Sequence, residues 1–136
     1  MAYSPPLDGA VGLIIIYAFF LGIAAFLGVT IVENIILWRF GWGSFLHSLL
    51  TAFVMNLVST IVGVVMAYTL LFSVRNISVA IYLVLFSISV VIEGTIMLGM
   101  KRSKYEAGKV WQLAVIANVI SYILLGIGWL IFLEVS

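Results

Sequence analysis

The sequence predicts an all-α integral membrane protein, a four-helix transmembrane bundle. Of its 136 residues, 65% are hydrophobic and 8% are charged, whereas a soluble domain has about 45–50% apolar and about 25% charged residues. The apolar residues form four long stretches, each with the about 20 residues that a helix needs to cross a bilayer. Strands would be shorter, and strands of a membrane barrel would alternate polar and apolar residues, which these stretches do not do.

The four stretches cover residues 11–32 (with an extension to residue 38 left open), 45–72, 77–100 and 110–133. An N-terminal tail, residues 1–10, precedes the single membrane domain, residues 11–136. This tail has no Lys or Arg, so we interpret the first stretch as a mature helix rather than a cleaved signal peptide. The first two connections are short, which makes consecutive helices antiparallel neighbours.

The basic residues predict the orientation of the chain. Five of the six Lys and Arg residues fall in two connections, 39–44 and 101–109, and the sixth is Arg75. Because cytoplasmic loops carry an excess of Lys and Arg, we expect these two loops in the cytoplasm and both termini outside.

Aromatic residues at the ends of the stretches fit this orientation. We expect Trp38, Trp42 and Trp111 at the inner membrane interface and Tyr68, Tyr82 and Trp129 toward the outer one. Such aromatic belts anchor helices at a fixed depth.

A pattern of rare polar residues occurs twice. The first half reads IVENII and later AFVMNLVS, and the second reads VIEGTI and later AVIANVIS. Each half therefore has a Glu followed by Ala-x-x-x-Asn-x-x-Ser. We interpret this as a tandem duplication of a helical hairpin, with repeats at residues 11–72 and 77–133. Two helices per repeat give both copies the same orientation, so a pseudo-two-fold axis would run along the membrane normal.

The rise of a helix places the duplicated polar residues at similar depths. Glu33 and Glu93 would lie roughly 9 and 12 Å inside the cytoplasmic ends of their helices, and Asn118 and Asn56 roughly 13 and 18 Å inside. We expect these side chains to converge on one polar layer in the inner leaflet. Ser59 and Ser121 follow the Asn residues at i+3 and so share their helix faces.

Two buried glutamates need a partner, because an ionised and unpaired carboxylate is costly in a membrane. They can be protonated and hydrogen-bonded to Asn and Ser, they can hold a cation, or they can meet a basic group of another chain. The first resolution is ordinary interhelical bonding, at about 0.6 kcal/mol per bond, whereas intramembrane ionisable residues commonly mark a functional site. We expect a site that binds or transports protons or cations. Its candidate residues are Glu33, Glu93, Asn56, Asn118, Ser59 and Ser121.

His47 is the single histidine and lies near the inner interface, where a histidine is usually solvated. As a ligand it would join Glu33 or Glu93 on a divalent metal.

Other polar and small residues have simpler interpretations. We expect Asn34 and Gln112 to be solvated near the interface. Small-residue stripes predict helix-packing faces; their members are Ala18, Gly22 and Ala25, and Ser59 with Gly63.

Composition excludes several function classes. The chain has no cysteine, so it has no disulfide redox centre, and one histidine cannot supply bis-His haem ligation. Six basic against five acidic residues make no basic face for nucleic acid.

Two alternatives to ion binding stay open. In the first, the chain is a non-catalytic accessory or scaffold subunit of a larger membrane complex, and its polar layer fixes helix register. In the second it is a lipid- or quinone-binding membrane enzyme, although no catalytic constellation is visible in the sequence. The partners we expect are membrane lipids and either further copies of the chain or a larger membrane complex.

Overall fold

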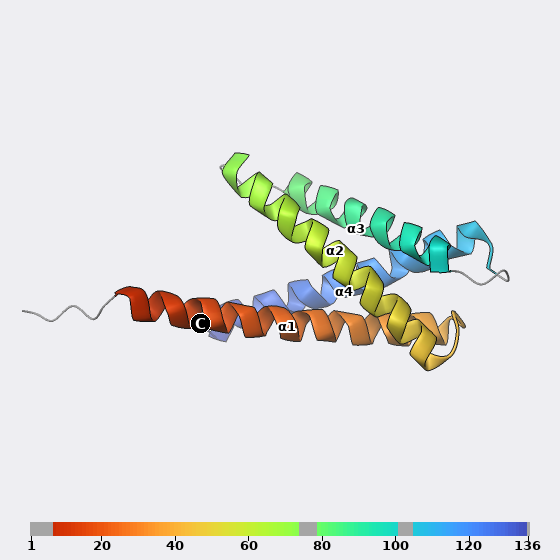
Figure 1. Ribbon diagram of the computed structural model, residues 1–136, viewed down its shortest axis with the longest axis horizontal. Coiled ribbons are helices and arrows are strands. Elements are labelled where there is room, and N and C mark those ends of the chain that lie inside the picture. The colour runs from red at the N-terminus through yellow and green to blue at the C-terminus, as the bar shows by residue number, and fades with distance from the viewer. Residues whose placement is uncertain (1–6, 74–78, 101–104, 136) are drawn as a thin grey trace, which may run out of the picture.

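The computed structural model describes residues 7–73, 79–100 and 105–135, and this part of the chain is all-helical. Its helices are α1 (Leu7–Arg39), α2 (Phe45–Ser73), α3 (Val79–Met100) and α4 (Ala107–Val135) (Figure 1). All four are long and apolar enough to cross a membrane. The predicted four-helix architecture is therefore confirmed.

Two helices begin earlier than the sequence predicts. α1 begins at Leu7, four residues before the expected start. α4 begins at Ala107 rather than at residue 110. The third connection is correspondingly shorter than expected.

A glycine turn ends α1 and leads into α2. The Trp42 N–H donates to the Leu37 carbonyl oxygen at 2.9 Å and the Gly41 N–H donates to the Trp38 carbonyl oxygen at 3.0 Å. This pair of bonds is the Schellman pattern of a helix C-terminus, which needs a left-handed residue. Gly41 supplies it with a φ of 78°. The Ser44 hydroxyl then accepts the His47 backbone N–H at 3.3 Å and caps the first turn of α2.

The helices form a ring. α1 and α3 each pack against both α2 and α4, and among the described residues no backbone contact joins α1 to α3 or α2 to α4. Toward the end where α1 begins, α2 and α3 diverge from α1 and α4 (Figure 1). At the opposite end, where α1 turns into α2, the helices converge.

Buried apolar side chains close the converging end. We call this cluster the Trp42 plug; its members are Leu37, Trp42, Ala52, Met55, Met97, Tyr105, Val110, Leu113 and Ala114. The Trp42 ring stacks on Tyr105 with 5.0 Å between centroids, and its indole N–H donates to the Thr51 hydroxyl at 3.1 Å. Trp42 is only 1% exposed, so its ring packs inside the end of the bundle and is not an exposed anchor as the belt interpretation expected. The turn at Gly41 folds the ring back over the end of the bundle.

The other aromatic residues expected in the interfacial belts differ in how exposed their side chains are. Trp38, Tyr68 and Tyr82 are exposed, as interfacial side chains need to be. Trp111 is half-buried and lies against α3, and the side chain of Trp129 lies outside the described residues.

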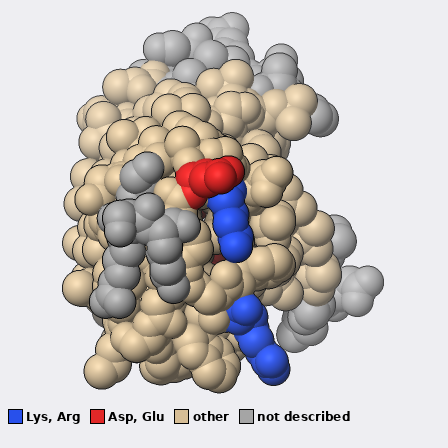
Figure 2. All heavy atoms as spheres, turned by 90° about the vertical axis from the view of Figure 1, so that its right-hand side faces the viewer, with Lys and Arg blue, Asp and Glu red and all other residues tan. Residues whose placement is uncertain are grey.

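Charged side chains of the described residues gather around the plugged end, which Figure 2 faces. Arg39, Glu106 and Lys109 are exposed there. The Arg39 guanidinium lies 5.8 Å from the ring centroid of Trp38, and the Lys109 ammonium lies 5.6 Å from that of Tyr105. These cations are therefore held at the surface by aromatic rings.

Candidate functional site

Each glutamate is hydrogen-bonded to an asparagine of the next helix along the chain. The Asn56 amide on α2 donates to Glu33 Oε2 on α1 at 2.5 Å, and the Asn118 amide on α4 donates to Glu93 Oε2 on α3 at 2.6 Å. The structure thus brings together, two by two, the residues that the duplicated pattern singles out.

The alanine of each Ala-x-x-x-Asn segment takes part in the same arrangement. The Asn56 amide also donates to the Ala52 carbonyl oxygen at 3.0 Å, and the Asn118 amide donates to the Ala114 carbonyl oxygen at 2.9 Å. An amide NH₂ has two hydrogens to donate. One therefore binds the carboxylate and the other binds the asparagine's own helix, which fixes how the side chain points.

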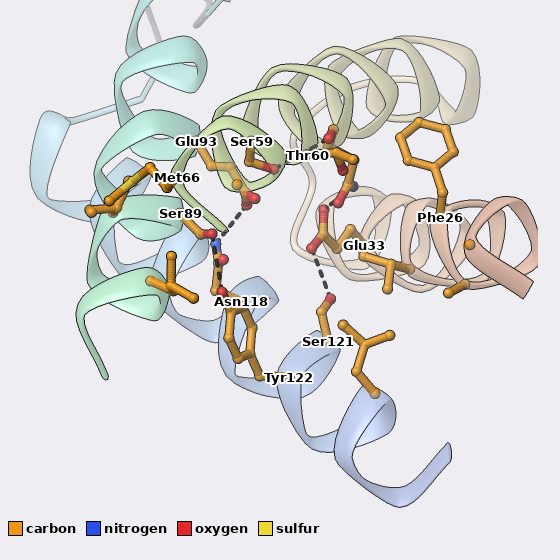
Figure 3. Close-up of a pocket in the computed structure, with 18 residues that line it drawn as sticks. Phe26, Glu33, Ser59, Thr60, Met66, Ser89, Glu93, Asn118, Ser121 and Tyr122 are labelled. Atoms are coloured by element: carbon orange, nitrogen blue, oxygen red, sulfur yellow. Dashed lines mark hydrogen bonds between the residues drawn. The ribbon is translucent and has the colours of Figure 1, made fainter. Parts of the chain in front are cut away.

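Each serine lies beside the glutamate of the other hairpin. The Ser121 hydroxyl on α4 donates to Glu33 Oε1 at 2.8 Å, so both oxygens of Glu33 accept a bond. Ser59 on α2 lies beside the Glu93 carboxylate (Figure 3), and its hydroxyl donates to the Asn56 carbonyl oxygen at 3.3 Å. Each carboxylate is therefore flanked by both hairpins.

A cavity of about 330 Å³ lies among the four helices, and all six candidate residues line it (Figure 3). From the glutamates it extends toward the diverging end, past Phe26 and Gly22 of α1 and past Gly63 and Met66 of α2. The Trp42 plug lies on the other side of the glutamates. The polar layer is therefore the floor of a cavity that is closed at the converging end.

Both carboxylates are buried and meet only neutral donors in the described part of the chain. Glu33 is 1% exposed and Glu93 is 2% exposed. The described basic side chains, Arg39 and Lys109, lie against aromatic rings at the surface. Any counter-charge for the glutamates must therefore come from the cavity or from outside the described residues.

No family model, curated protein or solved structure matches this chain. Its function has to be inferred from the site, because a fold by itself does not determine function. Chemically, two carboxylates on one cavity can each take up a proton or can share a cation between them.

Two further residues belong to the cavity wall. The Tyr122 hydroxyl and the Ser89 hydroxyl lie 3.2 Å apart, and the Tyr122 and Phe86 rings are perpendicular, with 5.2 Å between centroids. The sequence signal for them was weak: Ser89 lies one helical turn before Glu93, and Tyr122 directly follows Ser121. Their hydrogen bond ties α3 to α4 beside Glu93.

The expected solvation of Asn34 is wrong, whereas Gln112 is exposed as predicted. Asn34 is 1% exposed, and its side-chain oxygen has no hydrogen-bond partner among the described residues. The reason is that Asn34 shares the buried face of α1 with Glu33 and Leu37, whereas the opposite face, with Ile31 and Ile35, is exposed.

The predicted packing role of the small-residue stripes is also wrong for two glycines. A Cβ added at Gly22 or at Gly63 would meet no other atom within 4 Å. Both glycines line the cavity, because the helices diverge where these stripes lie. Ala25 and Ser59 line it as well.

His47 does not join the two glutamates. It lies in the first turn of α2, with its ring against Gly43, and it is not among the residues that line the cavity. Within the described residues no three His, Asp or Glu side chains come together as a metal site. The metal alternative with Glu33, His47 and Glu93 therefore has no geometry to support it.

Proposed function

We propose that this chain is a small polytopic membrane protein that binds protons or cations at Glu33 and Glu93 and passes them through the membrane. The observation that carries the proposal is the shared cavity: both carboxylates line it, and an asparagine orients each one. Ser59 and Ser121 complete the polar floor.

The partners of the glutamates support a cationic ligand. Asn56, Asn118 and Ser121 orient the carboxylates without neutralising them. A buried charge without a counter-charge is strongly unfavourable, so a proton or a cation from the cavity would balance it. Intramembrane acidic residues that face a cavity are typical of proton and ion pathways.

We further propose that the two hairpins are parallel repeats related by a pseudo-two-fold axis along the membrane normal. The like contacts of Glu33 with Asn56 and of Glu93 with Asn118 support this, as do the like bonds from each asparagine to an alanine carbonyl. With loops 39–44 and 101–109 in the cytoplasm, the cavity would extend toward the outer side and the Trp42 plug would close the inner side.

Flux through liposomes tests the proposal. The purified chain would be reconstituted with an internal pH-sensitive dye or with ²²Na⁺, and Glu33→Gln, Glu93→Gln and the double variant would be compared with the wild type. Glutamine keeps an oxygen that accepts from asparagine but carries no charge, so we expect the double variant to fold and to lose flux. Glu106→Gln is the matched control, since it makes the same change at an exposed residue before α4.

Thermal melts across pH and a panel of cations provide the binding readout. A ligand at one hundred times its Kd stabilises the folded state by about 2.7 kcal/mol, which a melt resolves. We expect a stabilising cation or pH range for the wild type and for Glu106→Gln, and none for the double variant. Unchanged flux together with unchanged melts in the double variant would show that the carboxylates are only interhelical hydrogen-bonding groups.

An accessory role is the second candidate, and the first half of α1 favours it. Its large apolar side chains point outward; the exposed ones are Val11, Leu13, Ile15, Ile16, Tyr17, Phe19 and Phe20. These positions lie all around the helix, and lipid or helices of a larger complex could cover them. Purification from native membranes in a mild detergent distinguishes the two roles, because an accessory subunit would be recovered with a stoichiometric membrane partner and would show no flux alone.

A further inference from the structure

The cavity above the glutamates has walls unlike its floor. The floor consists of carboxylate, amide and hydroxyl groups. The walls are mainly apolar; their large side chains are Phe26, Val29, Met66, Leu85, Ile88 and Leu125. Tyr122 stands between the two zones, with its hydroxyl on Ser89 and its ring against Phe86.

A small inorganic cation would use only part of this space. It needs oxygen ligands, which the floor provides, and it would leave most of the about 330 Å³ facing apolar side chains. Water is poorly held in an apolar cavity, because each molecule needs two to four polar partners. The cavity volume lies at the lower end of the range for pockets that bind small organic ligands, about 300–1,000 Å³.

The hydrogen bonds of Glu33 also restrict the ligand. Both of its oxygens already accept bonds, from Asn56 and from Ser121. Each oxygen has about one lone-pair site left. A ligand that offers diffuse positive charge and has no N–H groups to be bonded does not depend on these remaining sites.

We propose that the cavity binds an organic cation with apolar substituents, of the quaternary ammonium type, whose charge lies between Glu33 and Glu93 and whose substituents contact the apolar walls. This inference rests on the proposed function, since it names the class of cation that the paired glutamates take. It assigns the walls a binding role that a proton or a metal ion would not require.

Binding of radiolabelled benzyltrimethylammonium to the purified full chain tests the inference. We expect saturable binding that neopentylbenzene, the uncharged molecule of the same shape, does not compete away. In the Glu33→Gln/Glu93→Gln variant we expect binding about tenfold or more weaker, because the charge partners are gone.

A cavity-filling variant tests the role of the walls. Gly63 lines the cavity and has open space around it, so Gly63→Leu fills the cavity without a backbone clash. Gly99→Leu is the matched control, because Gly99 of α3 also has open space around it but does not line the cavity. We expect Gly63→Leu to weaken binding about tenfold or more and Gly99→Leu to bind like the wild type, with melts showing that both fold.

Three results would overturn the inference. Equal binding by Gly63→Leu and the wild type would mean that the cation does not occupy the cavity. No saturable binding, while sodium ions or protons still stabilise the wild type but not the double glutamine variant, would refute an organic ligand and leave the proposed function standing. If neither the organic cation nor the inorganic ones act through the glutamates, both proposals fail.

Discussion

Ser121 of α4 donates a hydrogen bond to Glu33 of α1 at 2.8 Å, which joins two residues 88 positions apart in the chain. Asn56 of α2 occupies the other oxygen of the same carboxylate. Glu33 therefore links its own hairpin to the second one. The site exists only when the two hairpins pack together, so stability and site geometry should change together.

Ser121→Ala should lower the free energy of unfolding by about 0.6 kcal/mol, the usual value for an interhelical bond in a membrane. In a Glu33→Ala background, which lacks the acceptor, Ser121→Ala should lower the free energy of unfolding by less than it does in the wild type. A double-mutant cycle in detergent melts measures this coupling. Ser87→Ala is the control, since the exposed Ser87 hydroxyl donates to the Leu83 carbonyl oxygen of its own helix. Fully additive effects would mean that Ser121 and Glu33 do not interact in solution.

Asn56→Leu should destabilise the fold more than Ser121→Ala does, by up to about 1.7 kcal/mol, the upper end of the range for interhelical hydrogen bonds in a membrane. Replacing both partners by apolar groups is much less costly than replacing one. The double variant Glu33→Met/Asn56→Leu should therefore melt closer to the wild type than Asn56→Leu alone.

Gln112→Leu provides the matched control for the asparagine, because Gln112 is an exposed amide on α4. It should leave the melting temperature nearly unchanged. If Asn56→Leu were as stable as Gln112→Leu, the Asn56–Glu33 bond would contribute nothing to folding.

The glutamates and asparagines of the site could be found from the sequence because polar residues are scarce in these helices. Glu33 and Asn56 stand 23 residues apart, and Glu93 and Asn118 stand 25 apart. In an antiparallel hairpin with a short turn, such a spacing places both residues at a similar depth. Chemical scarcity and helix geometry together therefore singled out these residues without a structure, but not which asparagine binds which glutamate.

Two other features could not be predicted in the same way: the burial of Trp42 in the plug, and the cavity itself. Trp42 is buried because Gly41 adopts a positive φ and turns the chain back over the bundle, whereas the sequence shows only a tryptophan near a predicted interface. Gly22 and Gly63 look like packing residues whether helices touch or diverge. Helix divergence depends on the packing of all four helices at once, and no local pattern encodes it.

Trp42→Ala should be among the most destabilising single changes in the chain. Removing a buried aromatic side chain costs about 3–5 kcal/mol, and Trp42 is stacked on Tyr105. Trp42→Phe keeps a ring but loses the indole bond to Thr51, so it should cost less. Trp38→Ala is the control, because Trp38 is 46% exposed; equal losses of melting temperature for Trp42→Ala and Trp38→Ala would place Trp42 outside the core.

Gly94 and Gly99 make a matched pair within α3. A Cβ on Gly94 would clash with Cζ3 of the Trp111 ring, whereas a Cβ on Gly99 would meet nothing within 4 Å. Gly94→Ala should therefore destabilise the fold by about 1–3 kcal/mol through overpacking. Gly99→Ala should be neutral or stabilise it by up to about 1 kcal/mol, because alanine favours a helix more than glycine does.

Relief of the Gly94→Ala clash by a smaller partner tests its cause. Trp111→Leu removes the ring that the new methyl group would meet, so the Gly94→Ala/Trp111→Leu variant should lose less stability than the sum of the two single changes. Because Gly94 directly follows Glu93, a shift of α3 away from α4 would also stretch the Glu93–Asn118 bond, and cation binding should fall in Gly94→Ala but not in Gly99→Ala. A Gly94→Ala protein that melts and binds like the wild type would show that Trp111 does not pack on α3 at this position.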